Sequence, residues 1–243
     1  MRSFKIEKTK PIQSYNLPAK YRDECNRFVD KLKKNLGSSI KLLVLTGSGG
    51  NEKIVENISD LDFMIVVEDS IESKKVIDLL AKITQNTSIK IGTTFYKRNE
   101  FEKGLIDTKT ISTLELLRKG IYNAIISDES LNIPALSDQY RRDMHKMVLG
   151  NYIHSLKRKL YNPIEEDVFQ IEKEIRNIKK FIISSKEKLL IDPELIVKEF
   201  DAMYPNSPEI PKFETKQQLS KYFMSCFDFL DFISEKVIIR GSR

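Results

Sequence analysis

The sequence predicts an α/β domain followed by an all-α helical bundle, and three observations lead to this fold class. Two short segments, Ile40 to Thr46 and Leu61 to Val67, carry branched apolar residues on both faces, which is typical of buried strands. Helical segments, with apolar residues at three- and four-residue steps, lie before and after these strands. Beyond residue 130 the helical period dominates. We therefore expect a first domain over 1–130 and a helical domain over 131–243.

Each element of the first domain has its own signal. A buried stripe, with Pro18 in the first turn and Gly37 after the end, predicts a helix over 18–36. After the two apolar strands, the pattern predicts a helix over 70–82, a strand over 88–96, a mostly helical segment over 101–119 and a strand over 122–127.

The second domain is predicted from helical stripes. Apolar residues at helical spacing predict helices over 144–160 and 168–182. Asp192 followed by Pro193 is typical of an N-cap and a first helical position, so a third helix should run to about residue 204. A last, Phe-rich helix is expected over 216–236. These helices predict a bundle with up-and-down neighbours.

Composition excludes several classes of protein. The 243 residues are 40% hydrophobic and 31% charged, which is typical of a globular chain. The longest apolar runs fall far short of the roughly 20 residues needed to span a bilayer, and Met1 to Lys10 lacks the apolar core of a signal peptide. Two cysteines without a CxxC motif, and two histidines, argue against a structural zinc site or a disulfide framework. We expect a cytoplasmic protein with no membrane partner.

The positive charge is concentrated in one segment. The net charge is +6, and Arg141 to Lys159 contains six basic residues and one acid, which gives +5. A local basic surface suits phosphate or nucleic acid, so Arg141, Arg142 and Lys146 are candidate contacts to an acceptor or a phosphate. The alternative explanation is a solvated helix face.

Glycine and acidic residues flank the two apolar strands. Gly47 and Ser48 follow the first strand, and Asp60 and Asp62 open the second. Because residues i and i+2 of a strand point to the same face, we expect the two carboxylates side by side at one edge of the sheet. A bound divalent cation would offset their repulsion, and oxygen-only ligands favour Mg²⁺, or Mn²⁺.

The glycine turn suits a phosphate. A backbone without Cβ atoms can approach a ligand closely, and Ser48 adds a hydroxyl and a main-chain N–H. Either part alone is commonly a turn, a solvated pair or a helix cap. Both parts together, on the flanks of two apolar strands, predict a phosphate-plus-metal site formed by Gly47, Ser48, Asp60 and Asp62.

These residues carry a resemblance. Leu45-Thr46-Gly47-Ser48, followed by Ser59-Asp60-Leu61-Asp62-Phe63, resembles the signature of the DNA polymerase β-like nucleotidyltransferase superfamily. The sequence is most similar to bacterial nucleotidyltransferases of the kanamycin nucleotidyltransferase and minimal nucleotidyltransferase type, over about residues 18–128. The resemblance implies a nucleotidyltransferase-like domain with a small mixed sheet, followed by an acceptor- or partner-binding bundle.

The resemblance also implies a reaction. An NTP substrate would bind its phosphates at Gly47 and Ser48, and Asp60 and Asp62 would be the catalytic residues that hold Mg²⁺. NMP would pass to a hydroxyl acceptor with release of pyrophosphate. RNA, a protein side chain and a small molecule remain open as acceptors. The basic segment favours nucleic acid over a cationic aminoglycoside.

One departure from the superfamily pattern keeps a second function open. The family usually places a third carboxylate on the next strand, but residues 88–99 contain no Asp or Glu. The matching position holds Thr93 or Thr94, and Glu100 and Glu102 after the strand are typical first-turn helix acids. The alternatives to an enzyme are therefore a non-catalytic nucleotide- or nucleic-acid-binding module and an antitoxin-like partner whose helical half docks another protein.

Overall fold

The protein divides into two compact units. The computed structural model describes residues 3–85, 87–161, 164–186, 189–190, 192–213 and 215–238. The units are Met1–Ser137 and Asp138–Arg243. The first unit extends beyond residue 130 because strand β6, Ile133–Pro134, pairs with β1, Ser3–Phe4, in a small antiparallel sheet that sequence patterns did not predict.

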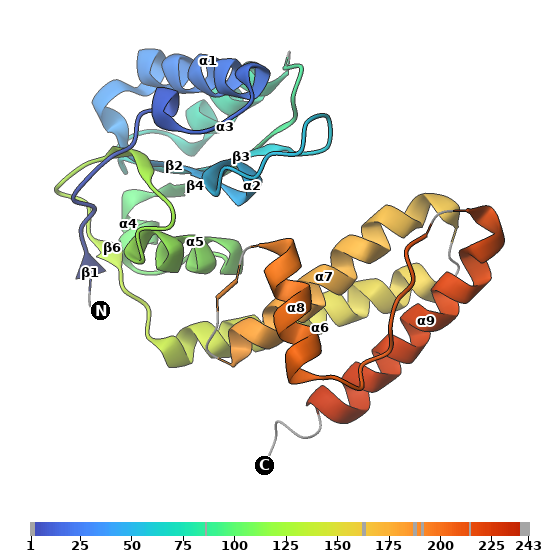
Figure 1. Ribbon diagram of the computed structural model, residues 1–243. Coiled ribbons are helices and arrows are strands. Elements are labelled where there is room, and N and C mark those ends of the chain that lie inside the picture. Colours follow the sequence, from blue (N-terminus) through green and yellow to red (C-terminus); the bar gives the residue numbers. More distant parts are fainter. Residues whose placement is uncertain are drawn as a thin grey trace. The chain divides into compact units, whose positions relative to one another are not determined.

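A four-stranded sheet forms the centre of the first unit (Figure 1). Its strand order is β4-β3-β2-β5, with bounds Ile91–Lys97, Leu61–Val67, Ile40–Thr46 and Ala124–Ser127. Strands β3 and β4 are parallel, whereas β2 is antiparallel to both β3 and β5. The expected small mixed sheet is therefore confirmed, with the two predicted apolar strands next to each other at its centre.

Helices lie on both sides of this sheet. Helix α1, Ala19–Leu36, and helix α3, Ser73–Thr84, bury their apolar stripes against one face, where Phe28 stacks on Phe63 with ring centroids 4.4 Å apart. Helices α4 and α5 lie on the opposite side (Figure 1). Successive residues of β3 therefore alternate between the α1 side and the α5 side.

The segment expected to be mostly helical over 101–119 forms two helices. Helix α4 spans Arg98–Glu102, and helix α5 spans Thr108–Arg118. Gly104, with a φ of 75°, lies between them, and the Asp107 carboxylate caps α5 by accepting a hydrogen bond from Thr110 N at 2.8 Å. This break places the first turn of α5 beside the sheet, which matters for the site below.

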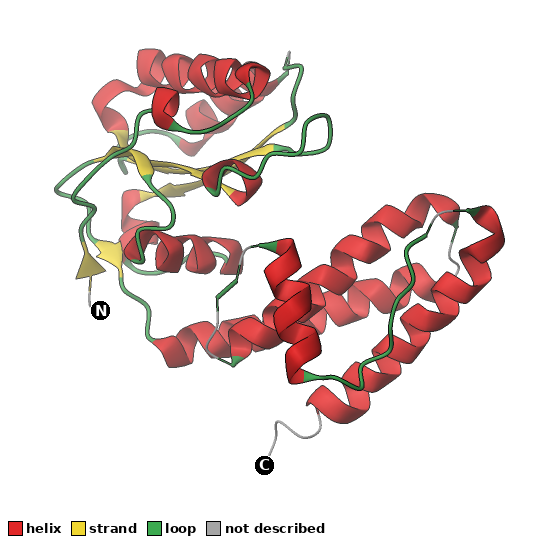
Figure 2. Ribbon diagram, in the orientation of Figure 1, coloured by secondary structure: helices red, strands yellow, loops and turns green. Residues whose placement is uncertain are grey.

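The described residues of the second unit form helices joined by loops, with no strand among them (Figure 2). Its α-helices are α6 (Asp138–Tyr161), α7 (Val168–Ser185), α8 (Pro193–Met203) and α9 (Leu219–Phe232); shorter helical segments are η3 (Glu165–Asp167), η4 (Lys216–Gln218) and the π-helical η5 (Ile233–Ile238). Their apolar stripes form one core. The predicted cap is present: Asp192 accepts hydrogen bonds from Glu194 N and Leu195 N. No helix among the described residues is long and apolar enough to cross a membrane.

Ion pairs join three strands at the end of the sheet away from the glycine turn. The Lys41 ammonium, on β2, lies 2.8 Å from Asp128 Oδ2, after β5, and 3.1 Å from Glu68 Oε2, after β3. Asp128 also accepts hydrogen bonds from the N–H and hydroxyl of Ser130. The Lys41 ammonium, followed by these Ser130 donors, holds the pKa of the Asp128 carboxyl well below its usual range.

This low pKa predicts a pH dependence of stability. Because the pKa of Asp128 is lower in the folded state than its unfolded-state value of about 4, the ionised carboxylate stabilises the fold above that pH. This contribution is lost as the pH falls toward the folded-state pKa. Asp128→Asn should lower the unfolding free energy of the first unit by about 1 kcal/mol at pH 7, because the pair is partly exposed. Urea unfolding should show the same difference at pH 5 and a shrinking one below pH ~4.

The matched control is Asp78→Asn. Asp78 pairs with Lys74 on α3, where its side chain is 61% exposed, so its loss should change the unfolding free energy little at any pH. A difference between Asp128→Asn and the unsubstituted protein that stays constant down to pH ~2 would contradict the assigned pKa direction.

Candidate active site

The glycine turn lies directly beside the start of β3. Strand β2 ends at Thr46, which is paired in register with Asp62, and the one-turn helix α2, Gly47–Gly50, follows. The Thr46 hydroxyl donates a hydrogen bond to the Asp62 carbonyl at 3.2 Å. Gly47 has a φ of 62°, a conformation that favours glycine, and it turns the chain across the mouth of β3. The structure thus brings Gly47 and Asp62 together.

The Asp62 carboxylate is framed by two glycines. A Cβ atom added at Gly47 would lie 3.2 Å from Asp62 Oδ2, and one added at Gly92 would lie only 2.4 Å from Asp62 Oδ1. Gly92 is the residue of β4 that pairs with Asp62 across the parallel ladder. Because Gly92 has no side chain, the carboxylate can lie against β4 with one oxygen, while the other oxygen faces the turn.

Both predicted carboxylates are ion-paired with lysines. Asp62 Oδ2 lies 3.0 Å from the Lys109 Nζ of α5, and Asp60 Oδ2 lies 3.5 Å from the Lys90 Nζ that precedes β4. The two acidic side chains are 33% and 42% exposed, so a ligand can reach them from solvent. The lysines offset the repulsion that the sequence alone predicts for two adjacent carboxylates.

The register of β4 shows which of its residues lie near Asp62. The residue of β4 that pairs with Asp62 is Gly92. Thr94 shares the face of Asp62 but lies two residues further along the strand, and Thr93 points to the other face. Glu100 and Glu102 belong to α4, where they bond to Lys97 N and to Arg98 and Asn132. Within the described residues, no group of three or more His, Cys, Asp or Glu could hold a metal ion.

The donor set fits a Mg²⁺ ion that is completed by substrate. Asp60 and Asp62 offer carboxylate oxygens, the ligands that Mg²⁺ takes in proteins, and Mg²⁺ commonly uses one or two carboxylates together with substrate phosphates and water. The two residues do not form an all-protein cage. Any metal site here would therefore depend on phosphate oxygens from a nucleotide.

Tyr122 supports the glycine turn, a role that no sequence pattern around it indicated. Its hydroxyl donates a hydrogen bond to the Gly47 carbonyl at 3.2 Å, and its side chain is buried. Burial, together with the nearby Asp62 carboxylate, raises the pKa of Tyr122 to about 12, so the hydroxyl keeps its proton at neutral pH. The expected strand over 122–127 begins at Ala124, which leaves Tyr122 outside the ladder and free to reach the turn.

The loop after the turn is tied down from the N-terminal segment, here residues 9–17. Glu52, which has a φ of 60°, pairs with the Lys10 ammonium and accepts a hydrogen bond from Asn16 N at 3.0 Å. Thr9 bridges to Ala124, beside the sheet. Because a non-glycine residue in the left-handed region is strained, these contacts are what hold Glu52 there.

Helix α1 holds the far side of the same loop. The Tyr21 hydroxyl donates a hydrogen bond to the Ser59 carbonyl at 3.2 Å and accepts one from Asn57 N at 3.1 Å. The Ser59 hydroxyl in turn accepts a hydrogen bond from Val55 N at 2.9 Å. The residues that lead into Asp60 are therefore anchored to the core.

Not all residues of α6 that were predicted to contact an acceptor or a phosphate are exposed to solvent. Arg141 is buried, and its Nη1 donates a hydrogen bond to the Ser184 carbonyl at 2.6 Å, so it has a structural partner in the helical unit. Arg142 is half-buried and bonds to Gln139, whereas Lys146 and Lys157 are exposed. At about 100° per residue, positions 142, 146 and 157 lie within about 60° of each other around the helix.

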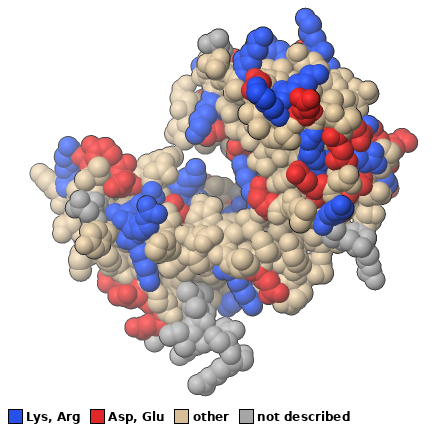
Figure 3. All heavy atoms as spheres, turned by 180° about the vertical axis from the view of Figure 1, so that it is seen from behind, with Lys and Arg blue, Asp and Glu red and all other residues tan. Residues whose placement is uncertain are grey.

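His145 is buried. Its ring contacts Phe181 edge-on, with centroids 5.3 Å apart. The face of the protein shown in Figure 3 carries basic and acidic side chains interspersed over both units. The basic residues of α6 that are not buried and share one side of the helix are Arg142, Lys146 and Lys157, and we call them the basic stripe.

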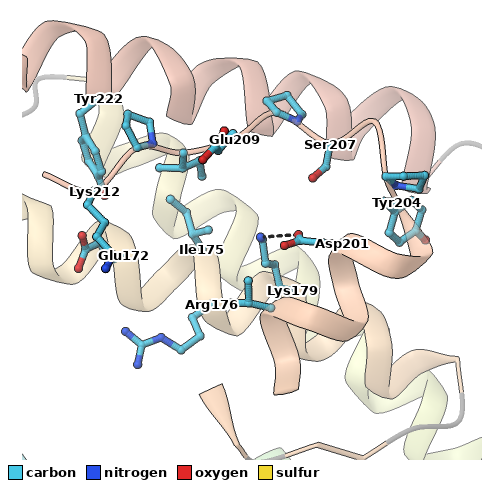
Figure 4. A pocket seen from close by; sticks show the side chains of 15 residues that line it. Glu172, Ile175, Arg176, Lys179, Asp201, Tyr204, Ser207, Glu209, Lys212 and Tyr222 are labelled. Atoms are coloured by element: carbon cyan, nitrogen blue, oxygen red, sulfur yellow. Dashed lines mark hydrogen bonds and ion pairs between the residues drawn. The ribbon is translucent and has the colours of Figure 1, made fainter. Parts of the chain in front are cut away.

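A groove of about 740 Å³ lies within the second unit, between α7, α8 and the segment 204–212. In Figure 4, Lys179 and Asp201 point toward each other, with Nζ and Oδ1 3.1 Å apart. Its charged lining residues are the basic Arg176, Lys179 and Lys212 and the acidic Glu172, Asp201 and Glu209. These charges cancel, so the groove has no electrostatic preference for a phosphate.

Comparison with known proteins identifies the fold. The crystal structure of spectinomycin adenyltransferase AAD(9) from Enterococcus faecialis, with ATP and spectinomycin, matches this structure with a TM-score of 0.50 and 14% sequence identity. The match covers 89% of this chain and 94% of that chain. The structure thus has the fold of a nucleotidyltransferase with a helical C-terminal part, and the predicted fold class is confirmed. No family model and no curated protein matches the chain.

Proposed function

We propose that this protein binds an Mg-NTP at the glycine turn and transfers NMP to a hydroxyl acceptor, with release of pyrophosphate. The observation that carries the proposal is the Asp62 carboxylate, framed by Gly47 and Gly92 directly beside the turn. The likeness in fold to an adenyltransferase whose structure contains ATP and a small acceptor supports the same reaction class.

Each site residue has a role in this proposal. The backbone of Gly47 and Ser48 binds the terminal phosphates, and Tyr122 keeps the turn in place through the Gly47 carbonyl. Asp60 and Asp62 hold Mg²⁺, which, when bound, neutralises charge at the attacking and leaving oxygens. The acceptor hydroxyl has no third carboxylate on β4 to take its proton, so we expect slow turnover.

A second candidate function rests on that same strand. Strand β4, where the superfamily pattern leads us to expect a carboxylate, contains no Asp or Glu, which supports a module that binds nucleotide without turnover. The two functions are separated by incubating the protein with Mg²⁺, NTPs labelled on the α-phosphate, and three acceptor pools: RNA, cell-extract protein and aminoglycosides that include spectinomycin. Labelled acceptor would support the transferase. Clear NTP binding with no labelled acceptor in any pool would support the binding module instead.

For the acceptor itself, we propose nucleic acid, because of the basic stripe on α6. Replacing Arg142 and Lys146 with glutamine should weaken RNA binding about three- to tenfold near physiological salt and flatten its salt dependence, since fewer counterions are released. Arg141 is left unchanged because it is bonded to Ser184 inside the unit. Filter binding at several salt concentrations measures both effects.

The control for this experiment is a double variant with the same charge change, Lys173→Gln with Lys198→Gln, at exposed positions of α7 and α8. It should bind RNA like the unsubstituted protein. If both double variants lower the affinity equally, only net charge matters, and the stripe on α6 is not an acceptor surface.

A further inference from the structure

The Asp62 oxygen that faces the glycine turn is ion-paired with a lysine of the same chain. Asp62 Oδ2 is the atom nearest to the Cβ position of Gly47, and the same oxygen lies 3.0 Å from the Lys109 ammonium. The other oxygen, Oδ1, lies against Gly92. A metal ion that binds Asp62 from the side of the turn must therefore compete with Lys109 for Oδ2.

The position of Lys109 is fixed by the first turn of α5. The buried Tyr96 hydroxyl, on β4, donates a hydrogen bond to Asp107 Oδ2 at 2.7 Å and accepts one from Asp107 N at 3.2 Å. It also lies 2.9 Å from the Thr110 hydroxyl. Since Asp107 caps α5, these contacts tie the start of the helix to the strand next to β3. Lys109 thus projects from an anchored backbone, although its own side chain is 55% exposed.

We propose that Lys109 couples metal binding to nucleotide binding at this site. Without nucleotide, its ammonium occupies Asp62 Oδ2 and weakens the binding of a divalent cation. With nucleotide present, the triphosphate gives the ammonium another partner and leaves Asp62 Oδ2 to the metal. This inference rests on the proposed function, and it adds that metal and NTP each strengthen the binding of the other by the same factor.

Mn²⁺ titration followed by electron paramagnetic resonance tests the proposal, because the signal counts free Mn²⁺ and needs no turnover. Without nucleotide, Lys109→Gln should bind Mn²⁺ about two- to fivefold more tightly than the unsubstituted protein, the range expected for loss of a partly exposed ion pair. A non-hydrolysable ATP analogue should then tighten Mn²⁺ binding less in the variant than in the unsubstituted protein.

Two further variants separate charge from position. Lys109→Arg keeps a cation at the site and should retain the weaker Mn²⁺ binding. Lys82→Gln removes the same charge from α3, on the other face of the sheet, and should bind Mn²⁺ like the unsubstituted protein. Equal Mn²⁺ affinity of Lys109→Gln and Lys82→Gln would overturn the coupling role.

Failure of the coupling role and failure of the proposed function give different results. If Asp62→Asn weakens Mn²⁺ binding but Lys109→Gln leaves it unchanged, the metal site stands and the coupling role is wrong. If the double variant Asp60→Asn with Asp62→Asn binds Mn²⁺ as the unsubstituted protein does, the metal does not bind at these residues, and both proposals are wrong.

Discussion

Replacing Asp60 and Asp62 together with asparagine is expected to abolish metal-dependent NTP binding. Amides keep the size of the side chains but remove the negative charge that a divalent cation requires. The triphosphate would then have to bind without a metal ion held by these residues. Because this metal site depends on both partners, we expect the affinity for Mg-NTP to fall by at least about 100-fold. Calorimetry with ATP, GTP, CTP and UTP in Mg²⁺ would measure the loss.

The matched control for this experiment is Asp23→Asn with Asp30→Asn. Both residues are exposed on α1, which covers the other face of the sheet, and the change in net charge is the same. This control should bind Mg-NTP normally. An Asp60, Asp62 double variant that keeps both the affinity and its dependence on Mg²⁺ would show that the nucleotide binds elsewhere.

The second large effect is expected for Asp62→Asn alone, measured as transfer of labelled NMP. Metal ions supply several kcal/mol of charge stabilisation in such reactions, so product formation should fall by a factor of about 100 or more. The melting temperature should change little, because Asp62 is partly exposed and its pair with Lys109 stabilises the fold by about 1 kcal/mol at most.

A melting scan in the absence of Mg²⁺ distinguishes lost chemistry from lost folding. If Asp62→Asn lowers activity and melting temperature together, the carboxylate supports the structure and its catalytic role is not established. If the labelled product forms at the usual rate, Asp62 is not a catalytic residue.

Local sequence patterns were sufficient to predict the central strands and the glycine turn. Strand β2 ends at Thr46 and β3 covers Leu61–Val67, as the apolar runs indicated, because strands buried on both faces need continuous apolar sequence. Their antiparallel pairing then brings Gly47 to Asp62. The helical second unit follows from its stripes in the same way.

Contacts that depend on register or on a helix boundary could not be predicted. Gly92 meets Asp62 only because β3 and β4 pair in one particular register. Lys109 reaches Asp62 only because a new helix begins after Asp107. The periodicity of residues 101–119 had indicated a single helical segment. Arg141 shows the reverse: its charge suggested a surface contact, but its place on the buried stripe of α6 puts it inside the unit.

The contacts between the N-terminal segment and Glu52 determine how far the chain can be shortened from its N-terminus without changing the site. A shortened chain that begins at α1 would keep Gly47, Ser48, Asp60 and Asp62, together with the whole four-stranded sheet. It would lose Lys10 and Asn16, the two groups that hold Glu52 in its left-handed conformation. Residue 52 would then be free to relax. The smallest fragment that contains every site residue is thus not the smallest fragment that preserves the shape of the site.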